Sequence, residues 1–258
     1  MKKTILSALA AMAVLWPLSA VAHDFWLSPV KAIEGEPVVL TLGYGHNFPE
    51  GEDIPAENLA DRFGPIVLEG PDAPHGLTGG SDSRILVGDK PLSGGGYLAH
   101  GSTTPLFLTQ TTSGWVIKPK DEVQGEGLVP VNSNLSVKHA KAVFVVGDGP
   151  TGILDSVVGQ KLELVPLANP ARLVVGDHLP VRLLFEGKPL AKATVDVFGV
   201  GEEVPSQSVM TDDSGLARIE VARQGVCRAM VNHLVPYGGD RTKAENELNI
   251  ATLVYIID

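Results

Sequence analysis

The stretch LPVRLLFEGKPLAKATVDVF, residues 179–198, carries the pattern that decides the fold class. Leu179 to Phe185 has the length and composition of a strand, and the next four residues, EGKP, have the composition of a turn. Ala193 to Phe198 then alternates between apolar and other residues, which is the period of a strand with one buried face. The stretch therefore predicts two strands joined through a turn.

The chain on the C-terminal side of this stretch continues the pattern. Thr211 to Gly215, TDDSG, is a strong turn signal between two apolar runs. The further predicted strands are Ser206–Met210, Leu216–Val221, Val226–His233 and Ile250–Ile257. Short strands at this spacing are typical of a β-sandwich.

The N-terminal half shows the same kind of apolar runs in a looser arrangement. The predicted strands here are Pro37–Leu42, Ile66–Leu68, Ile85–Val87 and Ala142–Val146. The 29 Gly and 19 Pro of the whole chain also favour β structure over helix bundles. The segment Pro166–Pro170, PLANP, is the expected linker. We therefore predict an all-β protein with two β-rich domains, residues 23–165 and residues 166–258.

Residues 1–22, MKKTILSALAAMAVLWPLSAVA, have the form of a secretion signal. Two lysines precede a short apolar run, and Ala20-Val21-Ala22 fits the small-x-small cleavage pattern. A membrane anchor is the alternative, but the run is shorter than the ~20 apolar residues of a span and contains Pro17. No later segment resembles a membrane span. The mature chain is expected in the bacterial periplasm, where its single cysteine, Cys227, forms no internal disulfide.

The charge of the chain excludes one class of partner. The formal net charge is −10. Removal of Lys2 and Lys3 with the signal segment leaves 18 basic against 30 acidic residues, a charge of −12. A surface this acidic repels nucleic acid and is compatible with a cationic ligand.

Cleavage after Ala22 makes His23 the first residue of the mature protein. A free N-terminal amine and the Nδ1 atom of the same histidine can chelate one metal ion. The amine has an ordinary pKa of ~7.7–8.0, so a metal can displace its proton near neutral pH. Imidazole suits nickel, copper, cobalt and zinc. The alternative is that His23 is only a residue tolerated after a cleavage site.

Three further histidines are candidate metal ligands. His46 lies in GYGHNFP, a turn directly after a predicted strand, where a loop can present an imidazole. His100 follows a glycine run, and His233 ends a predicted strand, where a core position is the alternative. The chain has no HExxH and no CxxC, so any metal site must be assembled from distant segments.

Motifs for nucleophilic catalysis or phosphate binding are absent from the sequence. There is no GxSxG elbow and no Walker loop, and Gly94-Gly95-Gly96 predicts an ordinary loop. Cys227 lies inside an apolar strand and is expected to be an inert core residue. The first hypothesis is accordingly a binding protein that catalyses no reaction.

Several segments together resemble a known family. The signal segment followed by AHDFWLSP at 22–29 resembles the NikK-like family of bacterial periplasmic proteins, described as accessory components of nickel or cobalt uptake systems. The further similar segments are GYGHNFP at 43–49, KHAKAVFVVGDG at 138–149, GQKLELVPLANP at 159–170, GDHLPVRLLFEGKPLAKATVDVF at 176–198 and TDDSGLARIEV at 211–221. The C-terminal part also resembles transthyretin-like or carboxypeptidase-regulatory β modules. We predict that this domain is an immunoglobulin-like or transthyretin-like sandwich.

The resemblance implies that His23 is a metal ligand and that the cargo is Ni²⁺ or Co²⁺. It also points to His46 and, at the end of its strand, to His233. The expected partner is then a membrane metal transporter or an outer-membrane receptor. Two alternatives stay open: an enzyme that binds copper through an N-terminal histidine brace, and a structural or adhesive β module without metal.

Overall fold

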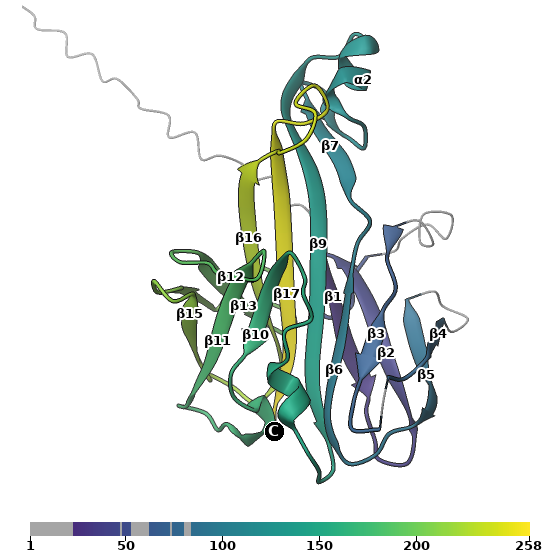
Figure 1. Ribbon diagram of the computed structural model, residues 1–258, viewed down its shortest axis with the longest axis vertical. Helices are drawn as coiled ribbons and strands as arrows, with labels where there is room; N and C mark the ends of the chain where they lie inside the picture. Colours follow the sequence, from purple (N-terminus) through teal and green to yellow (C-terminus); the bar gives the residue numbers. More distant parts are fainter. Residues whose placement is uncertain (1–22, 47, 53–61, 73, 80–83) are drawn as a thin grey trace, which may run out of the picture.

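The computed structural model describes residues 23–46, 48–52, 62–72, 74–79 and 84–258 (Figure 1). The predicted signal segment, residues 1–22, lies outside the described residues. The described chain is nearly all β, which confirms the predicted fold class. The described helical elements include α2 (Lys120–Gly125) and two 3₁₀ turns, η1 (Gly152–Asp155) and η2 (Pro170–Arg172). Within the described residues no helix has the length and apolar character needed to cross a membrane.

The largest sheet has nine strands and runs through the middle of the molecule. Its strand order is β14-β13-β16-β17-β9-β6-β3, and β7 and β8 extend it alongside β9. These strands are β3 (Val67–Glu69), β6 (Gly95–Ser102), β7 (Leu106–Thr111), β8 (Gly114–Val116), β9 (Pro130–Val146), β13 (Thr194–Gly199), β14 (Gln207–Met210), β16 (Gly225–Pro236) and β17 (Asn246–Ile257). The long strands β9, β16 and β17 form the vertical spine seen in Figure 1.

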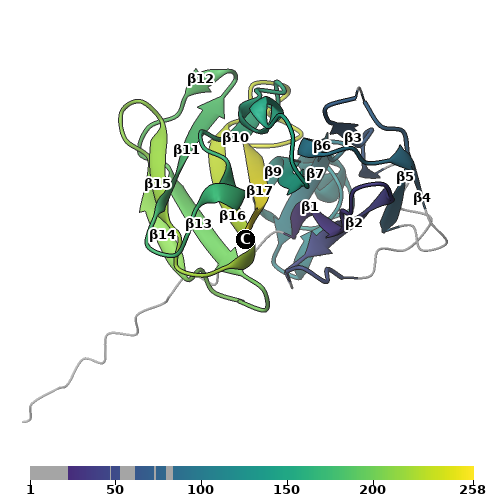
Figure 2. The same ribbon diagram turned by 90° about the horizontal axis from the view of Figure 1, so that it is seen from below.

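Two four-stranded sheets lie on either side of this spine (Figure 2). One has the order β1-β2-β5-β4 and contains β1 (Asp24–Lys31), β2 (Pro37–Gly45), β4 (Leu77–Gly79) and β5 (Ile85–Pro91). In the other, β11 pairs with β10, β12 and β15; its strands are β10 (Leu162–Pro166), β11 (His178–Phe185), β12 (Lys188–Pro189) and β15 (Leu216–Glu220).

The middle of the central sheet is buried on both faces, so the molecule has three layers there. Successive residues of a strand point to opposite faces. Val143 and Leu253 belong to the core shared with the β10-β11-β15 sheet. Their chain neighbours Phe144 and Val254 belong to the core shared with the β1-β2 sheet. Strands covered on both faces are expected to be continuously apolar, as the run from Ala142 to Val146 is.

The predicted domain boundary at 165/166 falls inside β10, which pairs with β11 over its whole length. Strand β9, on the N-terminal side of this boundary, pairs in parallel with β17 on the other side, from Asn134 opposite Asn246 to Val143 opposite Tyr255. One sheet therefore contains residues from both predicted domains. The division into residues 23–165 and 166–258 stays a prediction.

The structure extends several predicted strands and corrects one predicted loop. Strand β9 begins twelve residues before the predicted run at Ala142, and β1 and β6 were not expected as strands. Gly95 and Gly96 begin β6 instead of forming a loop. A Cβ on Gly96 would lie 3.0 Å from the Cα of Thr151, so the small residue permits close backbone packing. This is why a glycine run is compatible with a strand here.

Candidate metal centre

Two of the predicted ligands lie side by side because of strand register. Strands β1 and β2 are antiparallel, with Asp24 opposite Gly45. Continuing this register by one residue, back from Asp24 and forward from Gly45, places His23 opposite His46, and directly opposed residues are near neighbours. The centroids of the two imidazole rings are 4.8 Å apart. The hairpin therefore brings together histidines that are 23 positions apart in the sequence.

Glu52 completes this pair and was missed in the sequence. Its Oε2 atom lies 3.1 Å from Nε2 of His23, and its Oε1 atom accepts a hydrogen bond of 3.1 Å from the backbone N–H of His46. One ligand atom from each of the three residues lies within 4.8 Å of the others. Two atoms that bind the same ion with bonds of ~2.1 Å lie at most ~4.2 Å apart. A small movement of these side chains would therefore bring all three ligand atoms within reach of one ion. Two imidazoles and a carboxylate suit a divalent transition metal.

The glycines of the GYG segment explain why this loop can approach the strand. A Cβ on Gly43 would lie 2.0 Å from the indole of Trp26, so only glycine leaves room for that side chain. Gly45 has φ of +129°, and a Cβ there would lie 2.6 Å from Cγ of Glu52. Both glycines are therefore required for the arrangement of His46 and Glu52 next to β1.

Tyr44 contacts both His23 of the three-residue group and two cations. Its ring centroid lies 5.1 Å from that of His23. Arg62 and Lys138 both contact the same ring, with the Arg62 Cζ at 5.3 Å and the Lys138 Nζ at 5.4 Å from the centroid.

Burial lowers the pKa of His23 below its ordinary value of 6.5, with Glu52 opposing the shift. A lower pKa makes the neutral, metal-binding imidazole available at lower pH.

Lys138 is a buried charge whose removal is expected to stabilise the fold. It is 3% exposed, its Nζ donates to Ser136 Oγ at 3.2 Å, and burial lowers its pKa from 10.5 to about 8. The folded state thus disfavours the charged lysine. Burying this charge lowers the free energy of unfolding by ~3 kcal/mol, and the full loss applies below about pH 8. We expect Lys138→Met to raise the free energy of unfolding by ~2 kcal/mol at pH 7, after loss of the Ser136 hydrogen bond.

The pH dependence of this gain gives a specific test. Between pH 8 and 10.5 the unfolded chain binds the lysine proton and the folded chain does not, so the wild type becomes more stable as pH rises. The advantage of Lys138→Met in denaturant unfolding should therefore shrink over this range. The exposed Lys188→Met is the control and should change nothing. An equal gain at pH 7 and pH 10.5 would contradict the explanation.

The other two predicted ligands lie elsewhere. His100 Nε2 lies 3.3 Å from Glu69 Oε1, and the ring borders a cavity of about 330 Å³. In that cavity Ser102 Oγ is 2.8 Å from His139 Nδ1, and burial lowers the pKa of His139 to about 4. His233 packs its ring 4.6 Å from that of Phe185 in the opposite layer. Among the residues that the structure describes, only His23, His46 and Glu52 form a group of three metal ligands.

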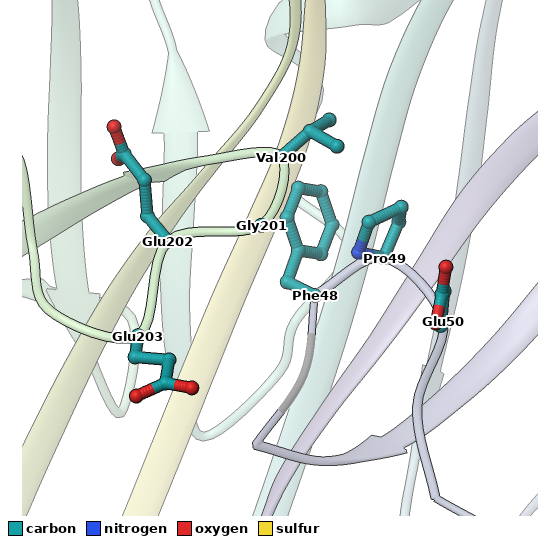
Figure 3. A pocket seen from close by; sticks show the side chains of 7 residues that line it. All are labelled: Phe48, Pro49, Glu50, Val200, Gly201, Glu202 and Glu203. Atoms are coloured by element: carbon teal, nitrogen blue, oxygen red, sulfur yellow. The ribbon is translucent and has the colours of Figure 1, made fainter.

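A small cleft of about 180 Å³ lies next to the loop that carries the group (Figure 3). Phe48 and Pro49 form one wall, and Val200 and Gly201 form the other. Three glutamates, Glu50, Glu202 and Glu203, also line it, and their carboxylates point in different directions. The carboxylate of Glu202 accepts from the Gly199 backbone N–H and pairs with Arg223.

Known structures resemble the chain only weakly. The D0-D1 domains of intimin match at 11% identity with a TM-score of 0.22, covering 90% of this chain and 97% of that one. A β-glucuronidase of Parabacteroides merdae matches at 11% identity and a TM-score of 0.22, and four immunoglobulin domains of Dscam1 at 13% and 0.20. The β-glucuronidase match covers 92% of this chain and 24% of the enzyme, and the Dscam1 match covers 90% of this chain and 51% of the Dscam1 chain. Scores this low support no inference about function.

Sequence comparison shows the family without showing an activity. No curated protein matches the chain. A family model does match, over residues 20–234, and its description is "Domain of unknown function (DUF4198)". This range includes all three residues of the candidate metal centre and spans most of the chain. The protein is therefore a member of the DUF4198 family.

Proposed function

We propose that the mature protein binds one divalent transition-metal ion in the periplasm, Ni²⁺ or Co²⁺ as cargo, and assists its uptake. The observation that carries the proposal is the convergence of His23, His46 and Glu52 at the start of the mature chain. The acidic surface adds support, because a net negative charge raises the local concentration of cations. The protein acts as a binder and not as an enzyme.

The N-terminal amine is a further proposed donor. Cleavage after Ala22 places this amine on His23, where it chelates the metal together with Nδ1 of the same residue. Nε2 then keeps its contact with Glu52 Oε2, 3.1 Å away, and donates a hydrogen bond to this carboxylate. Carboxylates commonly orient metal-binding histidines in this way. In the other arrangement Nε2 and Glu52 both bind the ion directly.

The recipient of the ion is proposed to be a membrane transporter or an outer-membrane receptor. This step is supported by the resemblance of AHDFWLSP and the later segments to the NikK-like family. Co-purification with a transporter from metal-starved cells is the direct observation that would support it.

The copper histidine brace is a second candidate with one observation in its favour. A brace needs the N-terminal histidine, a second histidine and an aromatic residue beside the metal, and Tyr44 lies against His23. Copper-loaded protein that oxidises ascorbate and produces peroxide would favour this enzyme over the metal carrier. A protein that binds no metal at all in titration would instead be a structural β module.

Substitution of the second histidine tests the metal site directly. His46→Ala is expected to weaken Ni²⁺ binding by ~10-fold or more, about 1.4 kcal/mol, because one of the few donors is removed. Isothermal titration calorimetry of the mature protein measures the change. The exposed His178→Ala is the control and should bind as the wild type does. Equal affinities for wild type and His46→Ala would exclude His46 as a ligand.

A further inference from the structure

Arg228 is a buried cation that pairs with Asp24, the residue next to the candidate ligand His23. It lies on β16 and is 1% exposed. Its Nη1 atom forms an ion pair of 3.2 Å with Oδ2 of Asp24, whose side chain is also buried. An isolated buried charge is costly, so the pair depends on good geometry. Asp24 follows His23 directly, so the guanidinium holds the residue next to the first metal ligand.

Three aromatic rings enclose the same guanidinium. The Cζ atom of Arg228 lies 4.9 Å from the ring centre of Trp26, 5.2 Å from that of Phe48 and 4.7 Å from that of Phe198. A planar guanidinium can stack on aromatic faces and pair with a carboxylate at the same time, which the ammonium group of lysine does poorly. These contacts are therefore specific to arginine.

The contacts reach both segments that supply metal ligands. Asp24 and Trp26 belong to the strand that begins beside His23. Phe48 belongs to the loop between His46 and Glu52, and this loop is also tied to β1 by the hydrogen bond from Trp26 Nε1 to Pro49 O, 3.3 Å. The backbone N–H of Gly201 donates to Phe48 O at 3.0 Å, next to Phe198. One buried side chain thus links the strand and the loop to the central sheet.

We infer that Arg228 is a positioning residue of the proposed metal centre, which it serves through Asp24, Trp26 and Phe48 without touching the ion. This inference rests on the proposed function, because it assigns a role in metal binding. Residues that orient metal ligands from behind typically change affinity by 10–100-fold when they are replaced. We expect a loss of this size in Arg228→Gln, together with a changed coordination geometry.

The test uses the mature protein that begins at His23. Ni²⁺ affinity is measured by calorimetry, and the electron paramagnetic resonance spectrum of bound Cu²⁺ reports coordination geometry. Arg228→Gln should bind Ni²⁺ ~10–100-fold more weakly and show an altered Cu²⁺ spectrum. Arg228→Lys, which keeps the charge opposite Asp24 but loses the stacked plane, should recover part of the affinity. Circular dichroism confirms that each variant is folded at the temperature used.

A second buried ion pair offers a matched control. Lys141 and Glu163 are 0% and 1% exposed and lie on the other face of the central sheet. Lys141→Met/Glu163→Gln removes this pair and should leave the Ni²⁺ affinity and the Cu²⁺ spectrum unchanged. If Arg228→Gln does not fold, Asp24→Asn/Arg228→Gln replaces it, since it leaves no charge without a partner.

The possible outcomes separate the inference from the proposed function. A wild type that binds no Ni²⁺ overturns the proposed function and this inference with it. A wild type that binds Ni²⁺, with folded Arg228 variants of equal affinity and identical Cu²⁺ spectrum, overturns the positioning role alone. An equal loss in the Lys141→Met/Glu163→Gln control would show that general destabilisation is the cause.

Discussion

Adding one glycine in front of His23 is expected to weaken Ni²⁺ binding by at least ~100-fold, about 2.7 kcal/mol. The extra residue leaves the imidazole in place but converts the amine of His23 into an amide. An amide nitrogen binds Ni²⁺ only after it loses its proton, so the proposed chelate is lost as long as this amide stays protonated. Calorimetry on the two purified mature forms measures the difference, with a glycine added after Asp258 as the control.

The pH dependence of binding separates the two donor arrangements. Imidazoles and the amine must lose protons before they bind a metal, so affinity rises with pH. With the amine as a ligand, the rise should continue to about pH 8, the ordinary pKa range of that group. The extended protein should stop gaining affinity near the pKa of an imidazole, and burial lowers that pKa for His23. If both forms bind equally well at pH 8, His23 binds through its side chain alone. Glu52→Gln should then weaken Ni²⁺ binding more than the added glycine does.

Lys141→Met is expected to lower the free energy of unfolding by ~3–5 kcal/mol, because it leaves Glu163 charged and buried without its cation. Glu163 accepts hydrogen bonds from Lys141 Nζ and from the backbone N–H groups of Val158, Gly159 and Gln160. Lys141 also donates to Ser156 O at 3.1 Å. The pair therefore holds the segment between β9 and β10, and its loss affects both strands. Denaturant unfolding followed by circular dichroism measures the change.

An exposed ion pair shows whether burial is the cause. Lys118 and Glu126 are paired at the surface with about half of each side chain exposed. Surface pairs contribute little, so Lys118→Met should leave the unfolding midpoint unchanged. The double variant Lys141→Met/Glu163→Gln should be more stable than Lys141→Met, because no charge is left without a partner. A loss in Lys141→Met no larger than in Lys118→Met would contradict this account.

Most strands could be predicted from local sequence because their residues alternate or form short apolar runs. The run from Leu179 to Phe185 and the alternation from Ala193 to Phe198 correspond to β11 and β13 within one residue at each end. The turn at Thr211 to Gly215 also lies where TDDSG predicts it, with Asp212 accepting from the backbone of Ser214 and Leu216. These features depend on neighbouring residues alone, so one sequence is sufficient to find them.

The beginning of β9 shows where this reasoning stops. Lys138, His139 and Lys141 are polar, yet all three are buried within a strand. Two of these side chains have partners from distant segments: Ser102 for Nδ1 of His139, and Glu163 for Lys141. A window of sequence contains no information about such partners, so polar residues in a run argue against burial. The prediction therefore began this strand only at Ala142.

By itself the sequence determined the fold class, the positions of the strands with alternating or short apolar runs, and the choice of His23 and His46 as candidate ligands, since each follows from residue types within a few positions. Only the tertiary structure decided that these two histidines face each other and that Glu52 joins them, because opposition of residues depends on the register of β1 and β2. The same is true of the parallel pairing of β9 with β17 and of Arg228 behind Asp24. Contacts between segments this far apart arise from packing of whole sheets, which local periodicity does not encode.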